Sequence, residues 1–184
     1  MKKFKNYLIE KKITVYHGDR HNTKKLDVKL MNNGNNQEGI GIYFSDNIED
    51  TKTYGKDVVS ASINTNNFIN SHDDIAVIGN SKIEKILKDL FKLDEEEFYY
   101  LITDYGVEVH NPEDVNENYI KELVNLIKNE EVRNFQIDLS DRFGVKQFVD
   151  IWNKITKIDG TFQKQNGSVW YSVINPKIKL TQEK

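Results

Sequence analysis

The chain has 184 residues, a formal net charge of -3 and 30% charged residues. A chain of this length fits one domain that buries its core without help from disulfides or metal ions. It contains no cysteine, which excludes disulfides, thiolate nucleophiles and zinc sites built on cysteine.

The N-terminal residues and the overall polarity predict a soluble, cytoplasmic protein. Lys2 and Lys3 after Met1 make the start basic, as in a signal peptide, but residues 6–10 are too short and too polar to supply its apolar core. No apolar run approaches the ~18 residues that a membrane-spanning helix needs. We therefore expect no association with a membrane.

The charges are distributed unevenly along the chain. Residues 1–30 carry nine Lys or Arg against three Asp or Glu, whereas residues 94–131 carry twelve Asp or Glu against two Lys or Arg. Such runs are commonly solvated faces, and an acidic face also suits a basic protein partner. No long basic stripe with interleaved aromatic residues is present, which disfavours nucleic-acid binding.

The first third of the chain is predicted to form short strands joined by turns. Three segments have β-branched or aromatic composition: residues 13–17, 40–44 and 58–63. The Asn-rich segment 32–36 predicts a surface loop between the first two strands. Asp46 or Asn47 can cap a brief helix that ends at Tyr54 and Gly55.

Between residues 80 and 155 the apolar spacing changes to a helical period. Three pairs of residues predict helix starts: Ser81 with Glu84, Asp94 with Glu97, and Asn111 with Pro112. The apolar stripes that follow are expected to face a core. The last two of these stripes are Val115, Tyr119, Ile120, Leu123, Val124 and Ile127, and then Phe148, Val149, Trp152 and Ile155.

The final segment again predicts strands. Residues 158–164 and 169–174 flank Asn166 and Gly167, a dipeptide typical of a two-residue hairpin turn. Pro176 then ends the ladder, because proline has no N–H to donate to it.

The order of these elements predicts an α+β fold. Strands come first, a helical segment follows, and strands return at the end. We expect one domain over residues 1–184, with residues 80–155 as a helical insertion within it.

Two short apolar runs contain the residues that indicate a binding or catalytic site. Tyr16, His17 and Gly18 end the first predicted strand, and the second ends in Gly41-Ile42-Tyr43-Phe44-Ser45. Tyr54 lies eleven residues after Tyr43. An imidazole beside a flexible glycine, together with two aromatic rings, suits the binding of a flat, amide-bearing ring such as nicotinamide.

Cleavage of the nicotinamide–ribose bond of NAD needs no strong acid, because the leaving group is already a cation. The site must hold the ring, orient the ribose and stabilise an oxocarbenium-like transition state. A glycine backbone can pair with the carboxamide, aromatic faces can sandwich the pyridinium, and an imidazole can bond ribose hydroxyls. His17, Gly18, Tyr43 and Tyr54 supply these groups.

These motifs resemble the diphtheria-toxin and poly(ADP-ribose)-polymerase branch of the ADP-ribosyltransferases, which carries a His–Tyr–Glu triad. The resemblance covers residues 12–63 and 156–180, and the second part looks like the closing strands of small phage-type and toxin-type members. It implies a split, two-sheet ADP-ribosyltransferase-like β core with NAD as co-substrate and no metal. The helical segment between the two parts has no counterpart in this resemblance.

The resemblance also implies a role for each residue of the motifs. His17 would hold a ribose of NAD, Gly18 and Ser45 would bind the carboxamide, and Tyr43 and Tyr54 would cover the ring. The full set of implied cofactor-binding residues is His17, Gly18, Asp19, Tyr43, Phe44, Ser45, Tyr54 and Trp170.

The sequence departs from the family pattern at two positions. Asp19 replaces the small hydroxyl residue that follows His-Gly in the family. The family's acidic residue stands just before the run of the last strand, where Trp170 aligns, and no Asp or Glu occurs from residue 161 to 180. That acid ordinarily bonds the nicotinamide ribose and stabilises the developing positive charge.

Three interpretations of the missing acid remain open. The target's own nucleophile assists a mono-transfer, or a substitute comes from Gln163, Gln165 or Asp159 in the hairpin, or the site binds NAD without turning it over. The catalytic candidates are therefore His17, Tyr43, Gln163 and Gln165.

Other kinds of site fit the sequence poorly. Phe44 stands where a dinucleotide-binding turn needs its third glycine, and no long helix opens behind it. His21, His72 and His110 have no metal-ligand spacing, so we expect no metal site. Ser45 and Ser172 have no plausible base partner for hydrolase chemistry.

The sequence thus predicts a mono-ADP-ribosyltransferase that moves ADP-ribose from NAD to a macromolecular acceptor, a protein in preference to nucleic acid, with release of nicotinamide. Small, cysteine-free, Asn- and Lys-rich chains of this kind suggest a bacterial or phage effector or toxin that acts in the cytoplasm of a bacterial host. Two alternatives stay open. One is an NAD glycohydrolase, and the other is a catalytically degenerate transferase fold that binds a basic protein through its acidic helical segment.

Overall fold

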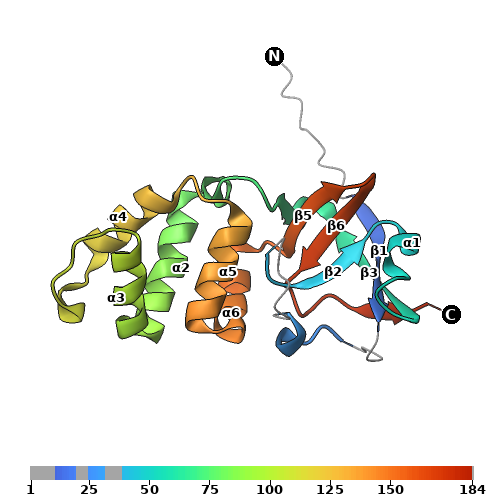
Figure 1. The fold of residues 1–184 in the computed structure, drawn as a ribbon, viewed down its shortest axis with the longest axis horizontal. Coiled ribbons are helices and arrows are strands. Elements are labelled where there is room, and N and C mark those ends of the chain that lie inside the picture. Colours follow the sequence, from blue (N-terminus) through green and yellow to red (C-terminus); the bar gives the residue numbers. More distant parts are fainter. Residues whose placement is uncertain (1–10, 20–24, 32–38, 184) are drawn as a thin grey trace, which may run out of the picture.

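The computed structural model describes residues 11–19, 25–31 and 39–183, and the expected Asn-rich loop lies outside these ranges. Within them the fold is α+β, as predicted, with a seven-stranded mixed sheet beside a block of helices (Figure 1). The strands are β1 (Lys12–Asp19), β2 (Ile42–Ser45), β3 (Asp57–Asn64), β4 (Phe68–Asn70), β5 (Gly160–Gln165), β6 (Ser168–Val173) and β7 (Leu180–Gln182). The helices are α1 (Ile48–Thr51), α2 (Asn80–Leu93), α3 (Glu95–Asp104), α4 (Glu117–Ile127), α5 (Val132–Phe143) and α6 (Val145–Thr156).

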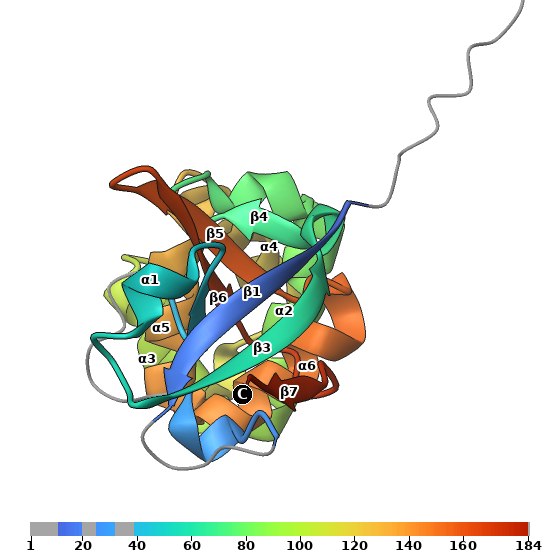
Figure 2. The same cartoon turned by 90° about the vertical axis from the view of Figure 1, so that its right-hand side faces the viewer.

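The sheet has the strand order β4-β5-β6-β2-β1-β3-β7. All neighbours are antiparallel except β4 and β5. Strand β1 pairs with β3 from Lys12↔Asn64 to Asp19↔Asp57, and the two run side by side in Figure 2. Strands β1 and β2 are paired at one position, Tyr16↔Ser45. The sheet is therefore nearly divided at the boundary between β1 and β2.

Strand alternation decides which side chains of this region are buried. Val15 on β1 lies opposite Ala61 on β3, and both side chains are buried in the core. Phe44 on β2 and Val173 on β6 are likewise fully buried. These residues belong to one continuous hydrophobic core that extends into the helical block.

The helical block consists of α2 to α6 and runs between β4 and β5 in the chain. Its predicted apolar stripes are buried except at Tyr119 and Ile155, which are half-buried. Trp152, Phe148 and Phe98 are among the largest side chains fully enclosed. Helix α5 was not predicted, because Gln136 and Ser140 occupy part of its buried face and dilute the apolar stripe.

The predicted helix starts agree with the structure only in part. Asp94 caps α3 by accepting a hydrogen bond from the backbone N–H of Glu97, as expected. The start predicted from Ser81 is wrong, because α2 begins after Gly79 and has no side-chain cap. The start predicted at Asn111 is also wrong: a 3₁₀ turn follows it, and α4 begins after Asn116.

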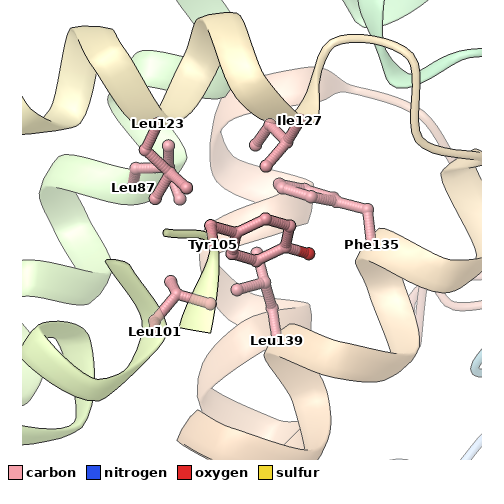
Figure 3. A pocket seen from close by; sticks show the side chains of 7 residues that line it. All are labelled: Leu87, Leu101, Tyr105, Leu123, Ile127, Phe135 and Leu139. Carbon is pink, nitrogen blue, oxygen red and sulfur yellow. The ribbon is translucent and has the colours of Figure 1, made fainter. Parts of the chain in front are cut away.

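A small apolar void lies inside the helical block (Figure 3). It is lined by Leu87, Leu101, Tyr105, Leu123, Ile127, Phe135 and Leu139, and it leaves no room for a water molecule. The Tyr105 hydroxyl donates a hydrogen bond to Glu130 Oε1 at 2.8 Å. Burial and this hydrogen bond raise the pKa of Tyr105, so its hydroxyl keeps its proton at neutral pH. The void is thus an imperfection of core packing rather than a ligand site.

The terminal hairpin forms as predicted. Asn166 and Gly167 join β5 to β6 with φ values of +52° and +88°, as a two-residue turn of type I′ requires. The short strands β4 and β7 were not predicted. No helix among the described residues is long and apolar enough to cross a membrane.

Candidate functional site

His17 lies where β1 and β2 separate. Its Nδ1 is 2.8 Å from the carbonyl oxygen of Tyr43, and its ring centroid is 5.4 Å from that of Phe44. Because a carbonyl only accepts hydrogen bonds, Nδ1 carries the proton, and Nε2 of the neutral ring keeps its lone pair. Burial lowers the pKa of His17, against the opposing effects of the Tyr43 carbonyl and the Asp19 carboxylate. The ring is therefore neutral at pH 7, with Nε2 available as an acceptor.

The lowered pKa of His17 gives a testable dependence of stability on pH. Below its ordinary value of 6.5, the unfolded chain binds a proton at this residue that the folded protein does not bind. Stability is therefore lost as the pH falls through this range. We expect the free energy of unfolding to drop more for the wild type than for His17→Gln between about pH 7.5 and about pH 5.5 in urea denaturation. Equal drops in the two proteins would contradict a buried, neutral His17.

Gly18 is covered by the end of α1. A Cβ at this position would collide with the carbonyl oxygen of Thr51 and would lie 2.9 Å from the backbone nitrogen of Gly55. The helix end can therefore approach β1 only because residue 18 lacks a side chain. Thr51 is itself buried, and no sequence pattern pointed to it.

Tyr43 is half-buried on β2, and its side chain faces the side of the sheet opposite to that of His17, because Gly18 rather than His17 lies opposite it in register. Its hydroxyl donates to the carbonyl oxygen of Gly39, whose φ of +101° favours glycine. The two residues thus meet through the Tyr43 main chain, at the edge of β2, rather than ring against ring.

Tyr54 and Trp170 form an aromatic wall. Their ring centroids are 5.8 Å apart in an edge-to-face arrangement, and Tyr54 is 54% exposed. Trp170 on β6 lies opposite Ser45 on β2 and opposite Gln163 on β5. Tyr43, Ser45, Gln163 and Trp170 therefore share one face of the sheet, and Tyr54 packs against it. His17 lies on the other face.

Ser45 is fully buried and makes two hydrogen bonds. Its Oγ donates to Asp50 Oδ2 at 3.0 Å and accepts from the backbone N–H of Asn47 at 3.0 Å. Its proton is therefore committed to Asp50, a residue that no sequence pattern singled out.

The remaining predicted residues occupy different surroundings. Phe44 is a core residue beside His17. Asp19 is 1% exposed and its carboxylate acts electrostatically on His17. Gln165 lies at the exposed end of β5, where its Oε1 accepts from Gln163 Nε2 at 3.4 Å. Asp159 accepts hydrogen bonds from the side-chain amides of Asn67 and Asn175, and so ties the ends of three segments together.

Among the described residues no group of three or more His, Cys, Asp or Glu side chains is placed to hold a metal ion.

Comparison with known proteins gives little further information. No protein-family model matches the chain, and no curated protein matches it. Among solved structures, a chain described as "Crystal structure of an anti-CRISPR protein" is similar, with a TM-score of 0.40 and 5% sequence identity over 94% of this chain and 96% of that chain.

Proposed function

We propose that the protein is a mono-ADP-ribosyltransferase that uses NAD as co-substrate and a protein as acceptor. In this proposal NAD lies across the boundary between β1 and β2. His17 holds a ribose from one face of the sheet, and Tyr43 and Tyr54 cover the nicotinamide ring from the other face, so that NAD passes between the separating strands. The Gly18 backbone binds the carboxamide.

The observation that carries the proposal is the hydrogen bond between His17 Nδ1 and the Tyr43 carbonyl. It fixes the tautomer of a neutral imidazole and leaves Nε2 as an acceptor for a ribose hydroxyl. It also joins the two motifs, 26 residues apart in the chain, at the point where the strands separate.

Two further features favour a site for a flat ring beside this bond. The Tyr54–Trp170 wall presents a partly exposed aromatic surface, which suits a pyridinium cation. The near-division of the sheet between β1 and β2 supports a split, two-sheet transferase core with an entrance along the boundary.

The reaction breaks the bond between C1 of the nicotinamide ribose and the ring nitrogen. The bonding electron pair stays with that nitrogen, so the leaving group becomes neutral nicotinamide. An acceptor side chain then bonds to C1 and releases its proton to solvent. The protein's contribution is to position the ribose and to stabilise the positive charge that develops on it.

The proposal predicts that the protein transfers label from NAD to a specific target. With labelled NAD and bacterial lysate, the wild type should label a defined protein and release nicotinamide. His17→Ala and Tyr43→Ala should lower nicotinamide release by about 10²-fold or more, because both act on the positioning of NAD. His72→Ala and Tyr100→Ala are matched controls, since both side chains are exposed and lie outside the site.

The same assay separates the two alternatives. Nicotinamide release without a labelled product indicates an NAD glycohydrolase. The absence of both, together with no heat on titration with NAD, contradicts the proposal. The binding-protein alternative is favoured by Glu95, Glu96, Glu108 and Glu113, which are exposed on the helical block and have no ion pair among the described residues. In that case a basic protein should bind in a salt-dependent manner.

A further inference from the structure

The turn that joins β5 to β6 projects from the body of the protein (Figure 2). Asn166 and Gly167 are both exposed there, and the strand pairing ends before them, at Gln165↔Ser168. Nothing lies within 4 Å of a Cβ built at Gly167. There is therefore open space beside the peptide bond that joins the two residues.

Asn166 and Gly167 have the groups for a reaction within the chain. A backbone nitrogen can attack the side-chain carbonyl of the asparagine that precedes it, which closes a five-membered succinimide ring. The attack needs an N–H that no acceptor holds, and it is least hindered at glycine, which has no side chain. Among the described residues, neither the Asn166 side chain nor the Gly167 N–H makes a hydrogen bond. Both conditions are therefore met at the hairpin turn.

Two other asparagines of the described chain lack these conditions. The backbone N–H of Ser71, which follows Asn70, donates to the carbonyl oxygen of Phe162 at 2.9 Å. Asn175 precedes Pro176, which has no N–H to lose. Neither asparagine can be attacked by the next residue while the fold is intact.

Asp159 and Gly160 form a related pair that the fold protects. The Asp159 carboxylate accepts hydrogen bonds from the side-chain amides of Asn67 and Asn175. Gly160 is packed so closely that a Cβ there would collide with the carbonyl oxygen of Ser172. A ring between these two residues has no room to form, in contrast to the open hairpin turn.

We propose that Asn166 is a deamidation site, at which the folded protein gains a negative charge. The Gly167 nitrogen bonds to Cγ of Asn166 as the bond from Cγ to the side-chain nitrogen breaks. The Gly167 proton leaves with that nitrogen as ammonia. Water then opens the ring at one of its two carbonyls and leaves aspartate or isoaspartate, each with one new carboxylate. Water is the other reactant, so the reaction is independent of NAD.

The two products affect the hairpin differently. Aspartate keeps the main chain unchanged and, like asparagine, is favoured before glycine in a type I′ turn. Isoaspartate extends the main chain through the side chain and adds a methylene, so the chain no longer matches a two-residue turn. We expect isoaspartate to weaken the pairing of Gln165 with Ser168.

The test follows one peptide of the protein with time. The folded protein is incubated at mildly alkaline pH, and samples are digested briefly with trypsin and sequenced by mass spectrometry. Cleavage after Lys164 and Lys177 places Asn166 and Asn175 in the same peptide. We expect the mass to rise at Asn166 and to stay constant at Asn175. The rate should increase with hydroxide concentration, because loss of the Gly167 proton promotes the attack.

The chain offers two further comparisons. Gly167→Ala should slow the conversion several-fold both in the folded protein and in urea, because the added methyl group hinders the attack. A second Asn-Gly pair, at residues 33–34, lies outside the described residues and falls in a different tryptic peptide, so it does not interfere. Conversion of Asn166 in urea but not in the folded protein overturns the inference, because the turn would then protect the residue. Equal rates at Asn166 and Asn175 also overturn it, because the damage would then be unspecific.

Discussion

Trp152→Ala is expected to lower the free energy of unfolding by about 3–5 kcal/mol. The side chain is fully buried in α6, and its ring packs at 5.6 Å from that of Phe148. Its Nε1 donates to the carbonyl oxygen of Ile158 at 3.1 Å, at the entry to β5. The change leaves a cavity and removes the hydrogen bond to the carbonyl of the half-buried Ile158, and both effects destabilise the fold. Urea denaturation followed by circular dichroism measures the loss.

The chain offers a matched control, because its other tryptophan is only half-buried. Trp170 loses an edge-to-face contact with Tyr54 when it is replaced by alanine, but no buried hydrogen bond. Trp170→Ala should therefore cost clearly less stability than Trp152→Ala. Similar losses in the two variants would contradict the full burial of Trp152.

Gly18→Ala is expected to displace α1 and, on the proposed function, to abolish the binding of NAD. The new Cβ would overlap the carbonyl oxygen of Thr51, which is backbone and cannot rotate away. Overpacking of this kind costs about 1–3 kcal/mol or more. The movement carries Tyr54 and Asp50 with it, because both lie on or directly after α1. Calorimetry with NAD and the melting temperature together report the effect.

Gly106→Ala separates this collision from the general cost of replacing glycine. Nothing lies within 4 Å of a Cβ at residue 106, although its φ of +81° disfavours alanine. That variant should lose about 1 kcal/mol of stability through backbone strain, and any binding of NAD by the wild type should be retained. If Gly18→Ala binds NAD as the wild type does, α1 does not need to contact β1 in the way the structure describes.

Local signals in the sequence were sufficient for elements that are stabilised locally. The β5–β6 hairpin follows from Asn166-Gly167 between two apolar runs, and α3 follows from the Asp94 cap. Strands β4 and β7 have only three residues each, and they are strands because of pairing with distant segments. Such pairing leaves no periodic pattern in the strand itself.

In the candidate site, too, short sequence motifs could be predicted, whereas contacts between segments far apart in the chain could not. The motifs around His17 and Tyr43 were recognisable because they are short and contiguous. Their hydrogen bond to one another was not, because it depends on how β1 and β2 separate. No sequence pattern indicated Asp50 or Thr51. Asp50 bonds Ser45, and Thr51 lies against Gly18, so both roles depend on contacts between distant segments rather than on a local motif.

The strand order also has a consequence for biosynthesis. On one side of the β1–β2 boundary β3 pairs with β7, and on the other side β2 pairs with β6, so each half needs residues from both parts of the chain. A ribosome that has synthesised residues 11–156 has supplied the whole helical block and strands β1 to β4, but not β5, β6 or β7. The helices can thus assemble during translation, whereas β2 and β3 keep open edges until residues 160–182 emerge. This interval is when the nascent protein is most exposed to aggregation and to proteases.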